Sequence, residues 1–494
     1  MKKSSLWLSA LGALAIAVAL AGCGQTYYFA GRVLPPSGLR NRVLVAIQNP
    51  SSANRGALEI LDAYYDIRYA YNNPNTTFSI SGYSGSLPVT IQNMPEEQNG
   101  AIYGSGDGSL VLADYEKEST AGAQKGLNGL SSSIFITRNK AFMFAASQAS
   151  HVLTVVDTGA GTSFALSLPG IYRVSVNPGG SAVLAFVQNS DYVYYPIKLS
   201  TQQTLAYSGG PSSWPKAAVD CEPQNAPGWC LFQAQSPDAV DATGTNYGAP
   251  LTFDRPVKAV FSNDGGTAYV LTCGAECGGT ASSVSLLPVG AMIFTQNQAS
   301  GLLPCNQPSV APCPNSKSSP YTSISVPGGA SNALIDSSTM YVVGQQLLLS
   351  DNLFTGNLTL VNLTNNTVGS AIAISDGAPG AMSRIIEADD NTLWIGMTKC
   401  TNGERYAKGQ SYGCLTMFNR STNTVTMIEP YQGDATGIAA VTSLHKVYVA
   451  EGGQVYIYNT VDGHALNNQY VTVSGTAWDV AYIDGLSDAN NTVY

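Results

Sequence analysis

Short apolar runs rich in β-branched and aromatic residues alternate with clusters of glycine, asparagine, aspartate and serine along most of this chain. Alternating apolar and polar positions over about four to eight residues, bounded by such turn residues, are typical of β-strands. Outside the N-terminal segment, long stretches with the period of an amphipathic helix are nearly absent. The pattern therefore predicts an all-β protein.

The apolar runs also recur as a unit. Residues 172–184 and 258–271 each contain a strand, an Asn-x-Gly-Gly turn beginning at Asn177 or Asn263, and a more apolar strand. The paired glycines supply the positive φ angles that a tight hairpin requires. A second piece, in which a strand ends at an aspartate or asparagine able to cap a turn, occurs at residues 152–159, 358–365, 415–423 and 455–463.

The spacing of these pieces is that of a propeller blade. Asn419 and Asn459 lie 40 residues apart, and propeller repeats measure about 40–50 residues. With its Tyr-Val strands at 267–271, 339–343 and 446–450, the chain resembles YVTN-type bacterial β-propellers over most of residues 41–494. The resemblance implies a fold and no particular activity. A pair of β-sandwiches, the alternative, explains the strands but not their recurrence.

Counting the units predicts a β-propeller of seven or eight blades, with eight counted. The N- and C-terminal strands should share one blade, because residues 477–482 look like a first strand whose second and third strands are 42–47 and 58–61. Sharing a blade closes the ring and protects both edge strands. Insertions are expected near 208–250 and 296–327. The remaining units lie near 87–122, 131–168, 170–207, 255–293, 329–374, 381–429 and 434–474.

The N-terminus resembles a bacterial lipoprotein signal. Lys2 and Lys3 precede an apolar run that ends in Leu20-Ala21-Gly22-Cys23, and this run is shorter than the roughly 20 residues that a bilayer span needs. The resemblance implies a signal peptide over 1–22, a lipidated Cys23 carrying acyl chains such as palmitate, and a tether over 23–40. The alternatives are an uncleaved anchor or a plain secretory signal. Gly24, where an aspartate tends to retain such proteins at the inner membrane, favours the outer membrane.

Charge narrows the classes of partner. Loss of residues 1–22 leaves 21 basic residues against 32 acidic ones, a net charge of −11. No basic cluster is visible in the sequence, and an acidic chain repels phosphate backbones, so nucleic-acid binding is not expected. Only 11% of residues are charged while 44% are hydrophobic, which favours a folded, charge-poor exterior protein.

The cysteines predict disulfides. Eight follow Cys23, and an even count in an exported chain indicates disulfide bonds, here between neighbours in sequence. A structural zinc site is not expected, because it would require histidines at ligand spacing from the cysteines. His151, His445 and His464 all lie far from the cysteine pairs in sequence. The four close pairs are Cys221 with Cys230, Cys273 with Cys277, Cys305 with Cys313, and Cys400 with Cys414.

Candidate contact residues lie in the first insertion. Trp214 and Trp229 are aromatic side chains on a long segment that a cysteine pair would brace, and such loops on rigid scaffolds tend to bind ligands or partners. A protein or glycan partner at the propeller loops is therefore expected. The sequence contains no calcium-loop motif, phosphate loop or nucleophile elbow that would assign a metal, a cofactor or a catalytic residue.

The sequence thus predicts a lipid-anchored extracytoplasmic β-propeller in the bacterial cell envelope that serves as a binding or scaffolding module. Two alternatives stay open. A propeller enzyme of lactonase or hydrolase type should place Asp, Glu or His around the central channel. A structural subunit of an outer-membrane assembly machine should instead bind a membrane partner.

Overall fold

The computed structural model describes most of the chain beyond residue 32. The described residues are 33–49, 56–67, 69–70, 73–80, 83, 85–94, 97–124, 127, 130–214, 218–224, 227–234, 250–289, 322–348, 353–375, 381–398, 414–428 and 433–487. The proposed signal peptide, Cys23 and most of the tether lie outside them. No helix of the described part is long and apolar enough to cross a bilayer.

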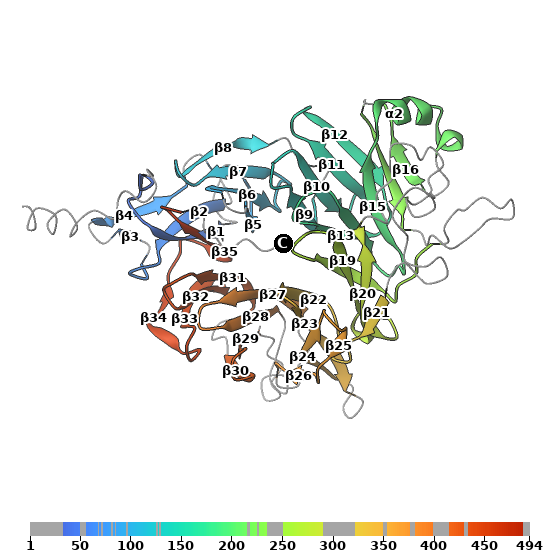
Figure 1. The fold of residues 1–494 in the computed structure, drawn as a ribbon. Coiled ribbons are helices and arrows are strands. Elements are labelled where there is room, and N and C mark those ends of the chain that lie inside the picture. The colour runs from blue at the N-terminus through green and yellow to red at the C-terminus, as the bar shows by residue number, and fades with distance from the viewer. Residues whose placement is uncertain are drawn as a thin grey trace, which may run out of the picture.

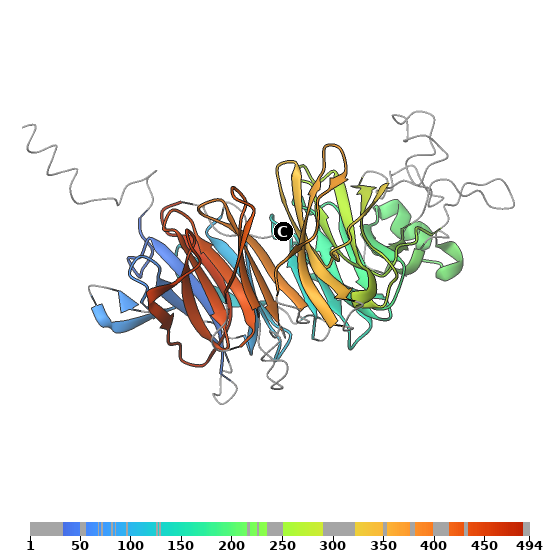
Figure 2. The ribbon, with the colours of Figure 1, turned by 90° about the horizontal axis from the view of Figure 1, so that it is seen from below.

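Eight antiparallel sheets surround a central axis, and each is one blade of a β-propeller (Figure 1). Seen from below, the blades form a thick disk with the helix α2 at its rim (Figure 2). The prediction of an all-β, eight-bladed propeller is confirmed. We number the blades 1–8 and give their strands from the axis outward.

Blades 1–4 follow one another along the chain. Blade 1 consists of β5 (Pro88–Asn93), β6 (Asn99–Gly104), β7 (Leu110–Asp114) and β8 (Ser119–Gln124). Blade 2 consists of β9 (Ser133–Ile136), β10 (Phe142–Ser147), β11 (Val152–Asp157) and β12 (Thr162–Ser167). Blade 3 consists of β13 (Ile171–Val176), β14 (Val183–Val187), β15 (Val193–Lys198), β17 (Trp229–Gln233) and β16 (Ala218–Glu222). Blade 4 consists of β18 (Pro256–Phe261), β19 (Thr267–Cys273), β20 (Ser282–Pro288) and β21 (Thr322–Ser325).

Blades 5–8 complete the ring. Blade 5 consists of β22 (Asn332–Asp336), β23 (Thr339–Leu348) and β24 (Leu353–Asn362), with β25 (Thr367–Val368) and β26 (Ile372–Ala373) both on β24. Blade 6 consists of β27 (Ala381–Ala388), β28 (Thr392–Thr398), β29 (Cys414–Asn419) and β30 (Thr424–Ile428). Blade 7 consists of β31 (Ala435–Val441), β32 (Lys446–Glu451), β33 (Gln454–Asn459) and β34 (Ala465–Val471). Blade 8 consists of β35 (Thr476–Asp484), β1 (Asn41–Gln48), β2 (Gly56–Asp62), β4 (Asn73–Ser79) and β3 (Tyr69–Ala70).

Blade 8 joins the two ends of the described chain, as the sequence predicted. Strand β1 pairs on one side with β2, where Val43 lies opposite Leu61, and on the other with β35, where Val45 lies opposite Val480. Both sides of β1 therefore have hydrogen-bond partners, and its segment Val43–Ile47 is fully buried. A closed ring leaves no inner edge exposed to pairing with another chain.

The repeated Asn-x-Gly-Gly segment forms the turn between the first two strands of blades 3 and 4. Gly180 and Gly265 adopt φ angles of 68° and 69°, which a side chain rarely tolerates. The Oδ1 of Asn177 accepts the backbone N–H of Ala182 at 2.9 Å. In blade 3 this amide and Gly180 together fix the register in which β14 returns, whereas in blade 4 Ser262 accepts the corresponding N–H of Thr267.

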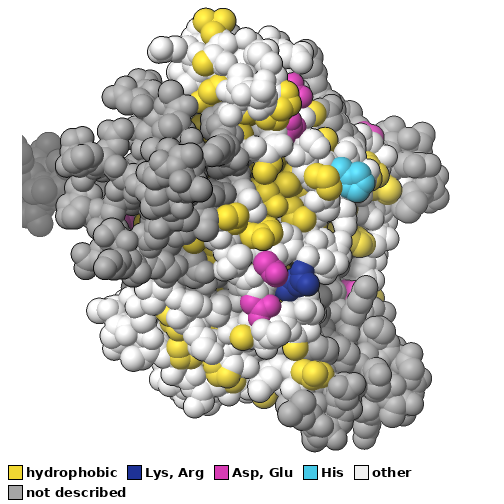
Figure 3. Space-filling model, turned by 90° about the vertical axis from the view of Figure 1, so that its right-hand side faces the viewer, with side chains coloured by type: hydrophobic (Ala, Val, Ile, Leu, Met, Phe, Trp, Pro, Cys, Tyr) yellow, Lys and Arg dark blue, Asp and Glu magenta, His cyan; other side chains and the backbone are white. Residues whose placement is uncertain are grey.

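Most of the apolar core lies between neighbouring blades. The cluster between blades 6 and 7, for example, contains the fully buried Trp394 with Tyr458 at 5.9 Å between ring centroids. The exterior is different: Figure 3, which views the side of blades 3 and 4, shows many uncharged side chains and few charged ones. The low charge content of the sequence is therefore visible at this surface.

Blade 3 departs from the expected unit over residues 170–207. Residues Thr201–Tyr207 form α2 instead of a fourth strand, because Ser200 and Gln203 make a reciprocal capping box. Pro211–Ser213 then forms the short helix η1. The outer strands β17 and β16 come from within the segment 208–250. In the segment 296–327, residues 322–325 are the outer strand of blade 4, and 296–321 lie outside the described residues.

Candidate functional site

A cavity of about 370 Å³ lies where the inner strands of blades 1–7 converge. We call it the axial cavity. Its lining includes Thr90 of β5, Ser133 of β9, Arg173 of β13, Lys258 of β18, Asn332 of β22 and Arg384 of β27. All six of these side chains are polar or charged, and they share the lining with apolar residues such as Phe135 and Ile385. The clusters between the blades are more uniformly apolar. The propeller axis is therefore the place where chemically functional groups gather.

These six residues occupy the same position in their blades. Each lies opposite an equivalent residue of the second strand, namely Tyr103, Ala146, Phe186, Leu271, Val343 and Gly396, in blade order. In β13, β18 and β27 the register shifts immediately before Arg173, Lys258 and Arg384. A β-bulge redirects the side chain that follows it. The repeat thus sets three cations at one level of the axis.

One of the three cations is neutralised by a buried carboxylate. Arg384 donates to Asp479 of β35 at 2.7 Å, and Asp479 also accepts the backbone N–H groups of Ile91 and Val480. Blade 7 has Gly437 at the equivalent position, where an added Cβ would lie 2.5 Å from the Asp479 carboxylate. The glycine therefore leaves the room that the Arg384–Asp479 pair needs.

The other two cations bond to neutral groups. Lys258 donates from Nζ to Oδ1 of Asn332 at 2.7 Å, and Arg173 donates to the carbonyl of Val257 at 3.3 Å. Among the described residues, neither has a carboxylate within ion-pair distance. Burial, with the charges of Arg173 and Arg384, lowers the pKa of Lys258 to about 7. The axial cavity therefore holds positive charge without full compensation.

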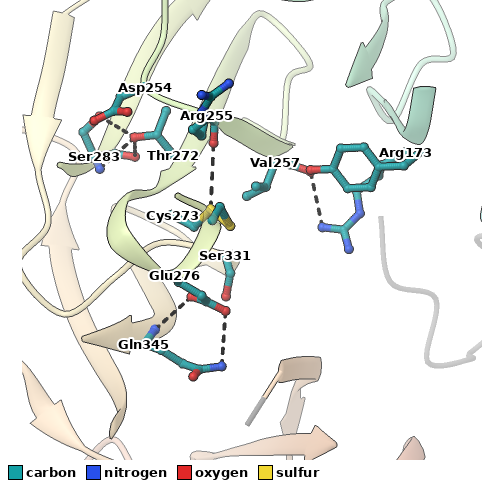
Figure 4. Close-up of a disulfide and its surroundings, with 12 residues drawn as sticks. Arg173, Asp254, Arg255, Val257, Thr272, Cys273, Glu276, Ser283, Ser331 and Gln345 are labelled. Atoms are coloured by element: carbon teal, nitrogen blue, oxygen red, sulfur yellow. Dashed lines mark hydrogen bonds between the residues drawn. A yellow bond between two sulfur atoms is a disulfide. The ribbon is translucent and has the colours of Figure 1, made fainter. Parts of the chain in front are cut away.

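A disulfide-bonded turn places a carboxyl group close enough to Arg173 to interact with its charge. Cys273 and Cys277 form a disulfide around the short helix η2 (Gly274–Cys277). Glu276, within it, accepts the backbone and side-chain N–H groups of Gln345 at 3.1 and 3.2 Å. Burial raises the pKa of Glu276 to about 7, against the opposing effects of Gln345 and Arg173. Figure 4 shows Glu276 beside Gln345, with Arg173 across the open space from them.

The two tryptophans singled out from the sequence lie elsewhere. Trp229 is buried between blades 2 and 3, where its ring meets Phe142 and Phe144 edge-on at 5.5 and 5.9 Å. It also lines a second cavity of about 290 Å³. Trp214 is half-buried, and its Nε1 donates to the carbonyl of Tyr207 at 3.2 Å. The structure brings neither residue to the axial cavity.

Two of the four predicted disulfides lie among the described residues. Cys221–Cys230 bridges directly opposed positions of β16 and β17, and Cys273–Cys277 closes η2. Nearest-neighbour pairing is thereby confirmed for these two. Cys305, Cys313 and Cys400 lie outside the described residues, as does the side chain of Cys414 in β29.

The histidines lie in exposed turns. His151 and His445 have positive φ angles, and His445 bonds to Asp390 at 2.8 Å. The contact with Asp390 raises the pKa of His445. Within the described ranges no group of three or more His, Cys, Asp or Glu side chains could hold a metal ion.

Arg173, Lys258 and Arg384 were not among the candidate residues predicted from the sequence. A signal was available: each is the sole charged residue or one of two in an otherwise uncharged inner strand. Aligning the two Asn-x-Gly-Gly motifs puts Tyr172, not Arg173, in the column of Lys258. Arg173 and Lys258 share a column only when the positive-φ glycines Gly180 and Gly265 are aligned. Convergence of that column on an axis follows only from closure of the ring.

No family model matches the chain, and no curated protein matches it. Solved structures resemble it at low identity. Hydrazine synthase of Kuenenia stuttgartiensis is 12% identical with a TM-score of 0.44, covering 78% of this chain and 99% of its own. The dihydro-heme d1 dehydrogenase NirN is 11% identical with a TM-score of 0.47, covering 90% and 75%.

A putative 6-phosphogluconolactonase from Bacteroides uniformis is 10% identical with a TM-score of 0.44, covering 90% of this chain and 99% of its own. These likenesses concern the fold alone. The topology itself establishes the chain as an eight-bladed β-propeller, and its distant structural neighbours include putative 6-phosphogluconolactonases.

Proposed function

We propose that this protein is a lipid-anchored extracytoplasmic binding module that holds a small polar ligand in the axial cavity. One observation carries the proposal: the inner strands of six blades turn polar and charged side chains from equivalent positions into a single cavity of about 370 Å³. Cavities of this size with convergent polar groups are typical of small-molecule sites. The rigid ring holds those groups in place before a ligand arrives, which lowers the entropy cost of binding.

Filling the axial cavity should abolish binding. Thr90 lines it and is half-buried, so Thr90→Trp is expected to occupy the space with an indole ring. Thr364→Trp, in an exposed turn of blade 5, is the matched control. Glucose, N-acetylglucosamine, succinate and sulfate serve as probes, and the readout is the rise in Tm that a bound ligand causes.

The expected result is a probe that raises the Tm of the parent protein and of Thr364→Trp but leaves that of Thr90→Trp unchanged. A probe that stabilises all three chains equally binds somewhere else. That outcome, or no stabilisation by any probe, contradicts the proposal.

Membrane attachment through Cys23 is the second part of the proposal, and it rests on the Leu20-Ala21-Gly22-Cys23 pattern. Cys23→Ser removes the thiol that would carry the lipid. In a bacterial host the parent chain should fractionate with membranes and incorporate labelled palmitate, whereas the variant should do neither. Gly24→Ala, which keeps the cysteine, is the control. Membrane retention of Cys23→Ser without label would indicate an uncleaved anchor instead.

A further inference from the structure

We infer that the ligand of the axial cavity is a compact dianion held by Arg173 and Lys258. This inference rests on the proposed function and narrows it to one chemical class. The class comprises small molecules with two negative charges close together, such as sulfate, phosphate or a short dicarboxylate. The two cations provide charge, and the polar groups beside them provide hydrogen bonds.

The charge balance of the axial cavity sets the ligand charge. Below about pH 7, where Lys258 is protonated, Arg173, Lys258 and Arg384 contribute three positive charges, and Asp479 compensates that of Arg384 across 2.7 Å. Two positive charges are left without a carboxylate partner among the described residues. A dianion neutralises both, whereas a neutral sugar neutralises neither.

The electrostatic surroundings of the axial cavity strengthen its preference for a dianion. The mature chain carries a net charge of −11, yet the groups at its axis are cationic and mutually repulsive. Charges in a confined, low-dielectric site interact more strongly than charges in water. An anion bound in the axial cavity therefore relieves this repulsion.

Neighbouring groups fit a ligand rich in oxygen atoms. Lys258 has three N–H donors and uses one of them in its hydrogen bond to Asn332. Arg173 has five N–H donors. Among the described residues it makes one hydrogen bond, at 3.3 Å to the carbonyl of Val257, and its guanidinium lies over the ring of Tyr172 at 5.6 Å. Donors thus outnumber their present acceptors at this level of the axis. Charge-assisted bonds from such donors to an anion are among the stronger hydrogen bonds in proteins.

The site should also respond to pH. The groups that act on Lys258 are Arg173 of β13, Asn332 of β22, and Arg384 of β27 with its partner Asp479 of β35. Glu276 of η2 interacts in turn with Arg173. The pKa values of Lys258 and Glu276 are both about 7. As pH rises through that value Lys258 loses its charge and Glu276 gains one, so anion affinity should fall.

Sulfate is the best first probe because it stays a dianion throughout this pH range. Titration calorimetry at about pH 6 should show one site, and Arg173→Gln or Lys258→Gln should weaken binding about tenfold to a hundredfold, the cost of one charge-assisted bond. Lys117→Gln, which removes an exposed charge paired with Asp114, is the control and should bind like the parent. The affinities for phosphate and for succinate are then compared at about pH 8.5, where both are dianions. This comparison distinguishes an inorganic oxyanion from a short dicarboxylate.

Measuring the sulfate affinity of the parent protein at several pH values tests the dianion inference without a substitution that could disturb folding. The affinity of the parent for sulfate should fall about tenfold between about pH 6 and about pH 8.5. Lys258→Gln should lose most of this dependence, and Glu276→Gln should lose a smaller part. Equal sulfate affinity in the parent, Arg173→Gln and Lys258→Gln overturns the dianion inference.

The outcomes separate this inference from the proposed function. Binding of glucose that Thr90→Trp blocks and Arg173→Gln leaves intact supports a ligand in the axial cavity and refutes a dianion. Sulfate binding that Thr90→Trp leaves intact contradicts both. Sulfate binding lost in Thr90→Trp, Arg173→Gln and Lys258→Gln alike supports both.

Discussion

A chain that ends at Gly475 is expected not to form a stable ring. It lacks β35, and with it the buried side chains of Val480, Tyr482 and Ile483. These three contribute together about 5–9 kcal/mol at about 1.5–3 kcal/mol each. A typical domain has a total stability of about 5–15 kcal/mol. The truncation also exposes one edge of β1 along its whole pairing with β35.

Circular dichroism and limited proteolysis measure this effect. The chain ending at Gly475 should lose its cooperative thermal transition and be digested rapidly. A chain ending at Ser487 retains β35 and is the control, expected to unfold like the full chain. Cooperative unfolding of the shorter chain near the parent Tm would show that blade 8 does not depend on its inner strand.

Replacing Arg42 by methionine is expected to lower the free energy of unfolding by about 3–5 kcal/mol, the usual cost of leaving one member of a buried ion pair alone. Arg42 of β1 is 1% exposed. It donates to Glu118 at 3.0 Å and to the carbonyl of Tyr115 at 2.7 Å in blade 1. Ser37 also donates to Glu118 from its backbone and its hydroxyl. The pair therefore fastens blade 8 to blade 1 at the seam of the ring.

Urea unfolding provides the measurement, with the midpoint expected to fall and the m-value to stay the same. The double variant Arg42→Met/Glu118→Gln removes the uncompensated carboxylate, so it should be more stable than Arg42→Met alone. Lys117→Gln breaks an exposed pair one residue from Glu118 and should leave the midpoint unchanged. A double variant that loses the full sum of two independent effects would mean that Arg42 and Glu118 do not interact.

The two ends of the chain were predictable as partners. Residues 477–482 begin a unit without the strands that should follow it, and residues 42–47 and 58–61 are such strands without a beginning. Since an incomplete blade leaves unpaired backbone groups at a sheet edge, the pieces had to meet. Blade 3 was less predictable, because α2 and the β16–β17 hairpin lie where the repeat predicts only the fourth strand of the blade. The capping residues Ser200 and Gln203 are a local signal for the helix, but nothing local places β17 beside β15.

The axial cavity was the least predictable feature. Trp214 and Trp229 attract attention in sequence because they are rare, aromatic and near cysteines, yet Trp229 serves the core between blades 2 and 3. Arg173 and Lys258 are inconspicuous in sequence, since a single cation in a strand usually faces solvent. They are 85 residues apart in sequence, and only the position of their strands at the axis brings them to one cavity.

The sequence by itself determined most of the strands, their turns, a ring of seven or eight repeats and its closure, because each follows from local alternation, from glycine at positive φ and from the need to pair every edge. The structure decided that the repeats number eight. Tertiary structure alone decided which charged positions converge, which carboxylate compensates Arg384, and how much positive charge is left at the axis. Those properties depend on distances between residues of different blades, and electrostatic interactions are set by such distances and by burial.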